Sequence, residues 1–203
     1  HTHIAPRYIN DSMQEVGVPN MVTAVLASYR AFDTFGEVVV IFTAGIGVFA
    51  LLSIMHNRHD EKTMSSMGDS MHEQHLILRI VSKIMLPFIM LFALYVQFHG
   101  DYGPGGGFQA GVIFAAGFIL YNIIFGIKVG QSILSINMTK NLMASGLLLY
   151  IFVGFLGILL GGNFLDYNPL SSNSVQGQLT GVFLIELGVG LTVSNVMILI
   201  FYS

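Results

Sequence analysis

The sequence predicts an all-α integral membrane protein with about five transmembrane helices. Of its 203 residues, 54% are hydrophobic and only 9% are charged. The mean hydropathy is +0.73, and the apolar residues gather in five separate stretches. A soluble domain carries roughly 25% charged residues, so this chain has too few charges to cover a water-facing surface. The composition therefore excludes a soluble cytosolic enzyme and also a disordered chain.

The five apolar stretches are each close to the length of a membrane span, which needs roughly 20 apolar residues in a helix. In chain order they are residues 38–55, 80–98, 110–127, 142–160 and 179–201. One such stretch could form a buried helix of a soluble protein, but five in series that are apolar on every side indicate membrane spans.

Glycines inside these stretches indicate that the helices pack closely against other helices. Gly157 and Gly161 form a GxxxG pattern, and Gly154 lies one turn before them. Small residues let helix backbones approach one another in lipid, whereas soluble helices avoid glycine.

A polar, methionine-rich segment divides the chain into two membrane modules. We expect a first module at residues 1–55 with one transmembrane helix, a polar cytoplasmic linker at residues 56–78, and a four-helix membrane domain at residues 79–203. Thr34 and Glu37 have the spacing of a capping box, which predicts that the first helix begins with Thr34 as its N-cap.

Lysine and arginine are distributed unevenly among the connections. They occur in residues 56–83 and after the third stretch, but not in residues 99–109 or 161–178. The positive-inside rule then places residues 1–36 outside the cell and the C-terminus in the cytoplasm. Because this polar N-terminal segment carries no signal peptide of its own, we expect an apolar helix upstream of His1.

Glu186 is the most informative single residue, about a third of the way into the last apolar stretch. A charged side chain at the centre of a membrane helix costs about 3 kcal/mol on insertion scales, so it must pair, protonate or face a wet cavity. We expect it to be a proton relay or a cation ligand. The alternative is a neutral glutamic acid that hydrogen-bonds a neighbouring helix. Thr192, Ser194 and Asn195 fit hydrogen bonds between helices better than an ion pathway.

Asp33 and Glu37 are acidic residues next to the beginning of the first stretch. Their negative charge suits a helix N-terminus, which accounts for them structurally. The alternative is a role at the entrance for protons or cations. Lys83, one turn inside the second stretch, fits a side chain that reaches back to the cytoplasmic headgroups, with an ion pathway as the alternative.

A glycine-rich loop joins the second and third stretches, and we expect it to lie on the outer side. Its central residues are Pro104, Gly105, Gly106, Gly107 and Phe108. Three successive glycines after a proline prevent a regular helix. The loop is either a tight turn or irregular backbone that dips into the membrane. In the second case, His99 and Asp101 are titratable groups at an outer mouth.

The sequence points to no catalytic centre, cofactor or metal site. The chain has no cysteine, which excludes disulfides, thiolate zinc sites, iron–sulfur ligation and cysteine nucleophiles. No phosphate-binding loop, dinucleotide fingerprint or HExxH motif is present. The histidine pairs His56/His59 and His72/His75 are expected to be solvated. The formal charge of -3 argues against nucleic-acid binding.

Residues 20–40 resemble the end of the large A subunit of Mrp-type multisubunit sodium/proton antiporters. That region typically reads N-V-V-N-x-I-L-V-D-F-R-G-F-D-T-L-G-E. Here Ala31 stands for the usual glycine and Phe35 for the usual leucine. Tyr29 replaces phenylalanine, and Ser28 stands where the family has an aspartate.

Residues 86–111 resemble the B subunit of the same antiporters (MnhB-like), whose pattern is G-H-x-x-P-G-G-G-F-x-G-G. Asp101 and Tyr102 differ from the common forms, and Ala110 replaces one glycine. Residues 176–193 also look like the last helix of the B subunit.

The resemblance implies a multi-pass subunit of a monovalent cation (sodium)/proton antiporter in a bacterial or archaeal plasma membrane. It implies A-, C-, D-, E-, F- and G-like partner subunits, sodium ions and protons as the transported species, and no cofactor. The protein would pack between larger subunits and line part of an ion path. The same modules occur in membrane-bound hydrogenases and related complex I-like redox complexes, so an equivalent role there is the first alternative. A purely structural role in assembly is the second.

Overall fold

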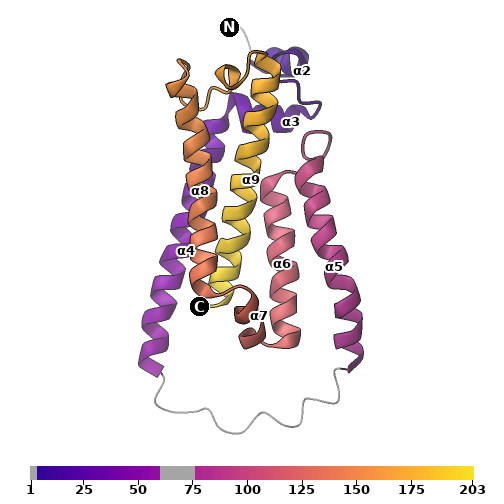
Figure 1. The fold of residues 1–203 in the computed structure, drawn as a ribbon, viewed down its shortest axis with the longest axis vertical. Helices are drawn as coiled ribbons and strands as arrows, with labels where there is room; N and C mark the ends of the chain where they lie inside the picture. The colour runs from indigo at the N-terminus through magenta and orange to yellow at the C-terminus, as the bar shows by residue number, and fades with distance from the viewer. Residues whose placement is uncertain (1–3, 60–75) are drawn as a thin grey trace.

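The computed structural model describes residues 4–59 and 76–203 of the chain, and in these residues it shows a bundle of long helices (Figure 1). Five of the helices are long and apolar enough to cross a membrane. These helices are α4 (Ala31–His59), α5 (Leu76–His99), α6 (Gly107–Phe125), α8 (Ile136–Leu159) and α9 (Ser174–Phe201). The predicted all-α membrane fold with five spans is confirmed.

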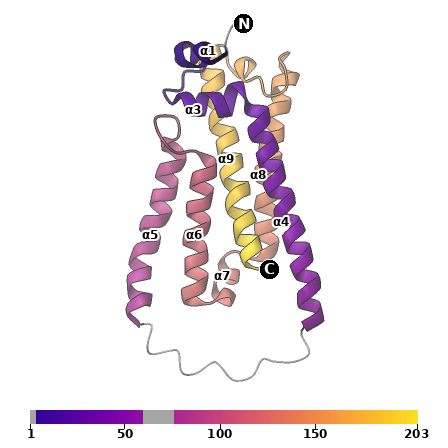
Figure 2. The ribbon, with the colours of Figure 1, turned by 180° about the vertical axis from the view of Figure 1, so that it is seen from behind.

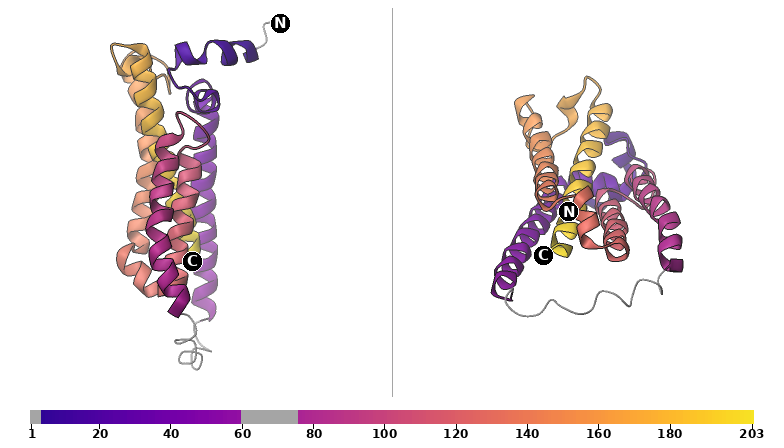
Figure 3. Two further views of the ribbon diagram at one scale, coloured as in Figure 1. Left: turned by 90° about the vertical axis from the view of Figure 1, so that its right-hand side faces the viewer. Right: turned by 60° about the horizontal axis from the view of Figure 1, so that its bottom comes forward.

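Shorter elements cover or connect the ends of the bundle. At the N-terminal end, helices α1 (Ile4–Asn10), α2 (Ser12–Glu15) and α3 (Met21–Ala24) lead into the π-helix η1 (Val25–Tyr29) (Figure 2). Elsewhere, α7 (Ile127–Ile133) joins α6 to α8, and the short 3-10 helix η2 (Asn168–Leu170) lies before α9. The view in Figure 3 shows α1 and α2 lying across the end of the long helices.

Helix α9 is the centre of the bundle. It packs against α4, α6 and α8, whereas α5 packs mainly on α6. Of the residues in the most apolar stretch of α9, 56% are buried, whereas only 11% are buried in the corresponding stretch of α4. Glycines make this close packing possible: a Cβ atom on Gly188 would lie 2.8 Å from the carbonyl oxygen of Gly146 in α8, and one on Gly111 would lie 2.9 Å from that of Gly190.

The GxxxG pattern in α8 serves a loop rather than a neighbouring helix. A Cβ atom on Gly157 would lie 2.6 Å from the backbone oxygens of Asn163 and Asp166, in the connection to α9. Gly161 has a φ of +92°, a left-handed conformation that ends a helix. This glycine pair therefore shapes the turn after α8.

The predicted start of the first long helix was wrong. Helix α4 begins at Ala31, three residues before the predicted cap. The hydroxyl of Thr34 is inside the helix and donates a hydrogen bond to the carbonyl of Leu26 in η1, at 2.7 Å. The capping box does not form because the preceding π-helix already supplies the first turn. Nearly all of the predicted linker (residues 56–78) lies outside the residues whose side chains the structure describes. The same holds for both histidine pairs.

Candidate functional site

The glycine-rich connection between α5 and α6 folds back tightly on the end of α5. The backbone N–H of Gly106 donates to the carbonyl of Val96 at 3.1 Å. Gly106 has a φ of +117°, a conformation that side chains disfavour. A Cβ atom on Gly105 would lie 2.6 Å from the carbonyl oxygen of Val96. The loop therefore needs glycine at both positions.

The carboxyl group of Glu186 lies against this loop. A Cβ atom on Gly106 would be 2.9 Å from Oε1 of Glu186, and one on Gly100 would be 3.2 Å from Oε2. Glu186 is in the fourth turn of α9, about 18 Å along the helix axis from Ser174 at about 1.5 Å per residue. The irregular loop thus lies beside the middle of α9 rather than beyond its end, and the missing side chains make room for a carboxylate.

Two polar residues of the first module fasten the loop from the other side. The side-chain amide of Asn20 donates to the carbonyls of Gly100, at 2.9 Å, and Gly103, at 2.7 Å. The buried hydroxyl of Thr23 donates to the carbonyl of Gly100 at 2.7 Å. Because α3 and its cap make these bonds across 77 or more residues of sequence, the first module and the loop form one site.

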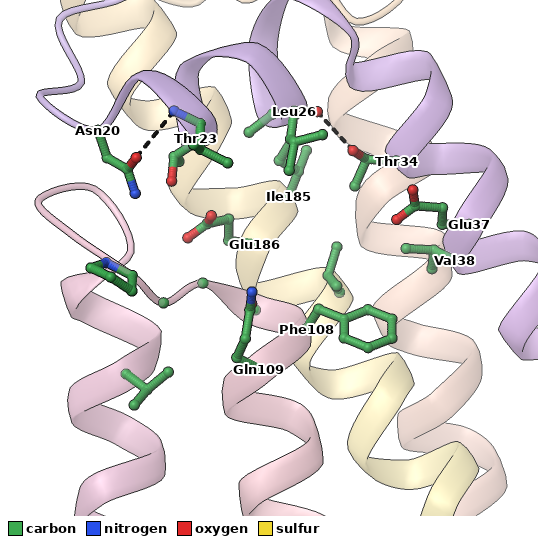
Figure 4. Close-up of a pocket in the computed structure, with 18 of the residues that line it drawn as sticks. Asn20, Thr23, Leu26, Thr34, Glu37, Val38, Phe108, Gln109, Ile185 and Glu186 are labelled. Carbon is green, nitrogen blue, oxygen red and sulfur yellow. Dashed lines mark hydrogen bonds between the residues drawn. The ribbon is translucent and has the colours of Figure 1, made fainter.

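A cavity of about 670 Å³ lies between the first module, the loop and α9. Figure 4 shows Glu37 reaching toward it from α4 and Glu186 from α9, with Asn20, Thr23 and Gln109 around it. The remaining lining is mostly glycine and apolar side chains. Two carboxylates from helices far apart in the sequence therefore border the same space.

Asp101 belongs to the glycine-rich loop but is not among the residues that line the cavity. Its carboxyl group is close enough to that of Glu186 for the two to repel when both are charged. Burial raises the pKa of Asp101 above its usual value. Its Oδ1 atom is buried without a hydrogen-bond partner among the described residues.

The other predicted site residues lie away from the cavity. His99 is at the end of α5 and stacks on Tyr95, with ring centroids 4.8 Å apart. Asp33 is exposed and accepts a hydrogen bond from Arg30 at 2.6 Å. Lys83 is exposed, and its ammonium group lies 5.8 Å from the ring of Phe125 near the far end of α6.

Sequence reasoning missed three residues that shape the site: Asn20, Thr23 and Tyr150. The Tyr150 hydroxyl is buried and donates to the carbonyl of Ala31 at 2.8 Å, which fixes the first turn of α4 beside α8. Asn20 and Thr23 stand inside the segment that resembles the A subunit of the antiporters, but nothing in their spacing shows that their partners lie in the distant glycine-rich loop.

Comparison with known proteins identifies the family. Residues 77–199 match a family model described as "Domain related to MnhB subunit of Na+/H+ antiporter". The chain belongs to this MnhB family. Residues 1–67 match a second model, MbhE, which describes the E component of MBH.

Several similar proteins are named as antiporter subunits. A putative antiporter subunit mnhB2 of Staphylococcus haemolyticus is 34% identical over 133 residues, which are 64% of this chain and 94% of that protein. A probable K+/H+ antiporter protein of Rhizobium meliloti, named as a joint A/B subunit, is 29% identical over 216 residues, covering 97% of this chain but 22% of that protein. The chain thus spans about a fifth of this longer relative.

Two solved complexes contain chains of the same fold. The Mrp complex from Dietzia sp. DQ12-45-1b aligns with a TM-score of 0.69 at 25% identity, over 98% of this chain and 23% of that chain. The membrane-bound sulfane sulfur reductase, an archaeal respiratory membrane complex, aligns with a TM-score of 0.70 at 28% identity, over 97% and 84% of the two chains.

These findings confirm the resemblance seen in the sequence. The chain is an MnhB-type, multi-pass membrane subunit of a multisubunit cation/proton antiporter. Its named relatives are transporter subunits, and its family works in hetero-oligomeric complexes.

Proposed function

We propose that this MnhB-family subunit lines part of the ion path of a monovalent cation (sodium)/proton antiporter, with Glu186 and Glu37 as the groups that bind the ions. The observation that carries the proposal is the cavity of about 670 Å³ bordered by both carboxylates. Ionisable residues inside membrane helices are rare and mark ion pathways and proton relays.

The chemistry of exchange follows from what a carboxylate can hold. Its oxygens bind either a proton or a hard cation such as sodium, and each occupant excludes the other at a single group. A second carboxylate across the same cavity raises the attraction for a cation and makes simultaneous ionisation costly. Alternating occupation by protons and cations is the elementary step of antiport.

We further propose the orientation and the division into modules. Residues 1–36 lie outside and the C-terminus in the cytoplasm, so that the glycine-rich loop, with Asp33, His99 and Asp101 nearby, faces the outer entrance. Arg79, Lys83 and Lys128 support this because they lie toward the opposite end of the bundle. The modules are residues 1–55 and 79–203, joined by the linker at 56–78. The separate family matches to 1–67 and 77–199 support that division.

The test is sodium-driven and potassium-driven proton exchange in vesicles that contain the assembled complex. We expect Glu186→Gln to slow exchange by about 100-fold, the size of contribution typical of a positioned proton-transfer group. Glu15→Gln is the control, because Glu15 pairs with Arg7 in the N-terminal segment, away from the cavity. Exchange at the normal rate in a correctly assembled Glu186→Gln complex would leave only an assembly role.

A second candidate is the equivalent role in a membrane redox complex. The match of residues 1–67 to the MbhE model and the structural likeness to the sulfane sulfur reductase complex favour it. A redox complex needs cysteine-rich subunits that hold iron–sulfur clusters. Iron and acid-labile sulfide in the purified complex, with matching electron paramagnetic resonance signals, would support this candidate, and their absence would support the antiporter.

A further inference from the structure

A second cavity, of about 420 Å³, lies between α5, α6, α8 and α9. The proposed ion site does not use it. Its lining is largely apolar, but Gln97 of α5 and Ser194 and Asn195 of α9 also face it. Burying polar side chains among apolar ones costs free energy unless they are hydrogen-bonded, so each of these residues needs polar partners.

Gln97 lines the second cavity and lies beside α9 close to Glu186. Glu186, Gly190 and Ser194 recur every four residues and therefore lie on one face of α9. A Cβ atom on Gly190 would be 2.7 Å from the side-chain oxygen of Gln97 and 3.3 Å from the carbonyl oxygen of Gly107. Glycine at position 190 thus leaves the Gln97 amide beside α9, one turn below Glu186.

Asn195 has a buried acceptor that no described residue satisfies. The side chain is 4% exposed, and its amide N–H groups donate to the carbonyl of Leu191 at 2.8 Å and to the hydroxyl of Ser194 at 3.4 Å. Its Oδ1 atom has no partner among the described residues. A buried polar atom of this kind needs water, and the adjacent cavity has room for several molecules.

Two more unsatisfied atoms lie further along the same side of α6 and α9. The Oδ1 atom of Asn122 and the hydroxyl of Tyr202 are buried without a hydrogen-bond partner within the described part of the chain. The two side chains face each other at the C-terminal end of the bundle, but not in the geometry of a full hydrogen bond. Between them and Asn195 lies an apolar cluster that includes Phe118 and Ile198.

We propose that five polar side chains form a water-bearing file that carries protons between Glu186 and the end of the bundle near Tyr202. They are Gln97, Ser194, Asn195, Asn122 and Tyr202. In each step a hydrogen-bonded water gives one proton to its neighbour and receives one from the group behind it, so no net bond is lost. The cluster of Phe118 and Ile198 is the narrow point. This inference rests on the proposed role of Glu186.

The first experiment tests whether the file holds water, using the fact that the chain has no cysteine. Single variants Asn195→Cys and Asn122→Cys are made in the complete complex in native membranes and treated with silver ions, and the remaining free thiol is counted after unfolding. The control is Val193→Cys, a site on the same helix that is 1% exposed in an apolar cluster.

We expect Asn195→Cys and Asn122→Cys to react at least about tenfold faster than Val193→Cys, because burial among apolar groups suppresses the reactive thiolate. Equal reaction rates at all three positions would overturn the file. Equal reaction rates at the three positions are also expected if a lipid chain fills the second cavity.

The second experiment tests whether the file carries protons. We expect Asn195→Leu to slow proton exchange in vesicles by about tenfold, which corresponds to about 1.4 kcal/mol and is the effect of losing one hydrogen-bonding group. Thr192→Val is the control, because Thr192 bonds the backbones of α9 and α8 outside the file. Normal exchange in an assembled Asn195→Leu complex would overturn proton transfer through the file.

The two proposals fail in different ways. Silver accessibility at Asn195 with no effect of Glu186→Gln on exchange would refute the role of Glu186 and keep the water file. A large effect of Glu186→Gln on exchange, with no silver accessibility at Asn195, would refute the water file and keep the role of Glu186.

Discussion

At the scale of single residues, Glu186 and the glycines beside it explain how a carboxylate is accommodated within a membrane helix. The carboxyl group lies where Gly100 and Gly106 have no side chains, and it borders a cavity. This arrangement lowers the cost of the charge by leaving space for water or a cation. The loop glycines therefore make the room that the acid occupies.

The substitution Gly106→Ala tests this dependence. The φ of +117° is strained for alanine, and the new Cβ would lie 2.9 Å from Oε1 of Glu186. We expect a loss of about 1–3 kcal/mol in stability, as for other strained backbone positions. The measurement is the temperature at which the purified complex dissociates. Gly47→Ala is the control, because no atom lies within 4 Å of its Cβ position, and an equal loss there would contradict the explanation.

Asp101 predicts a pH dependence. Because burial raises its pKa, the folded protein holds this proton more tightly than the unfolded chain. Its contribution to stability is therefore greatest below the unfolded pKa and falls as the pH rises through the folded value. We expect Asp101→Asn to reduce the fall in dissociation temperature as the pH rises above the usual aspartate pKa of about 3.9. Asp11→Asn, at an exposed site, is the control, and an unchanged profile in Asp101→Asn would refute the prediction.

At the scale of elements, the short helix α3 and the π-helix η1 bring the first module onto the glycine-rich loop. Their segment holds Asn20 and Thr23, whose side chains bond the loop carbonyls, and Leu26, whose carbonyl accepts from Thr34 of α4. A π-helix places one extra residue in a turn and is frequent at functional sites. Here it redirects the chain from the loop to α4 and thereby aims Glu37 at the cavity.

Removing the Asn20 side chain should loosen the loop. Asn20→Ala deletes two hydrogen bonds to buried or half-buried carbonyls and the N-cap bond that the side-chain oxygen accepts from the Val22 N–H, at an expected cost of about 1–3 kcal/mol. Amide hydrogen exchange of residues 100–106 in the complex should become faster, while exchange in α8 stays the same. Gln176→Ala, at an exposed position of α9, is the control. Unchanged exchange in the loop of Asn20→Ala would show that α3 does not hold it.

At the scale of the whole molecule, the two spans that follow each other in sequence lie on opposite sides of the bundle. Figures 1 and 2 show α4 at one edge and α5 at the other, with α9 between them. Consecutive elements are usually neighbours in space, so this wide separation is uncommon. It follows that the first module meets the four-helix domain through α8, α9 and the glycine-rich loop, where the cavity forms.

Composition and local pattern were enough to establish the number of spans, contiguous motifs pointed to the family, and Glu186 stood out as the acid deepest in a span. Each of these follows from a cost that acts on a short segment: roughly twenty apolar residues must leave water, and one carboxylate must not face lipid. The resemblance to the MnhB family came from contiguous motifs and was confirmed.

Three-dimensional contacts separated the candidate ionisable residues from one another. Glu37 joins Glu186 at the cavity, whereas Asp33, two residues into α4, turns to Arg30, and Lys83 lies toward the other end of the molecule. The start of α4 at Ala31 likewise depends on η1 and on the Tyr150 hydroxyl of α8. Such outcomes depend on distances between helices that are far apart in the sequence, and those distances are set by glycine contacts and hydrogen bonds between helices that no local pattern encodes.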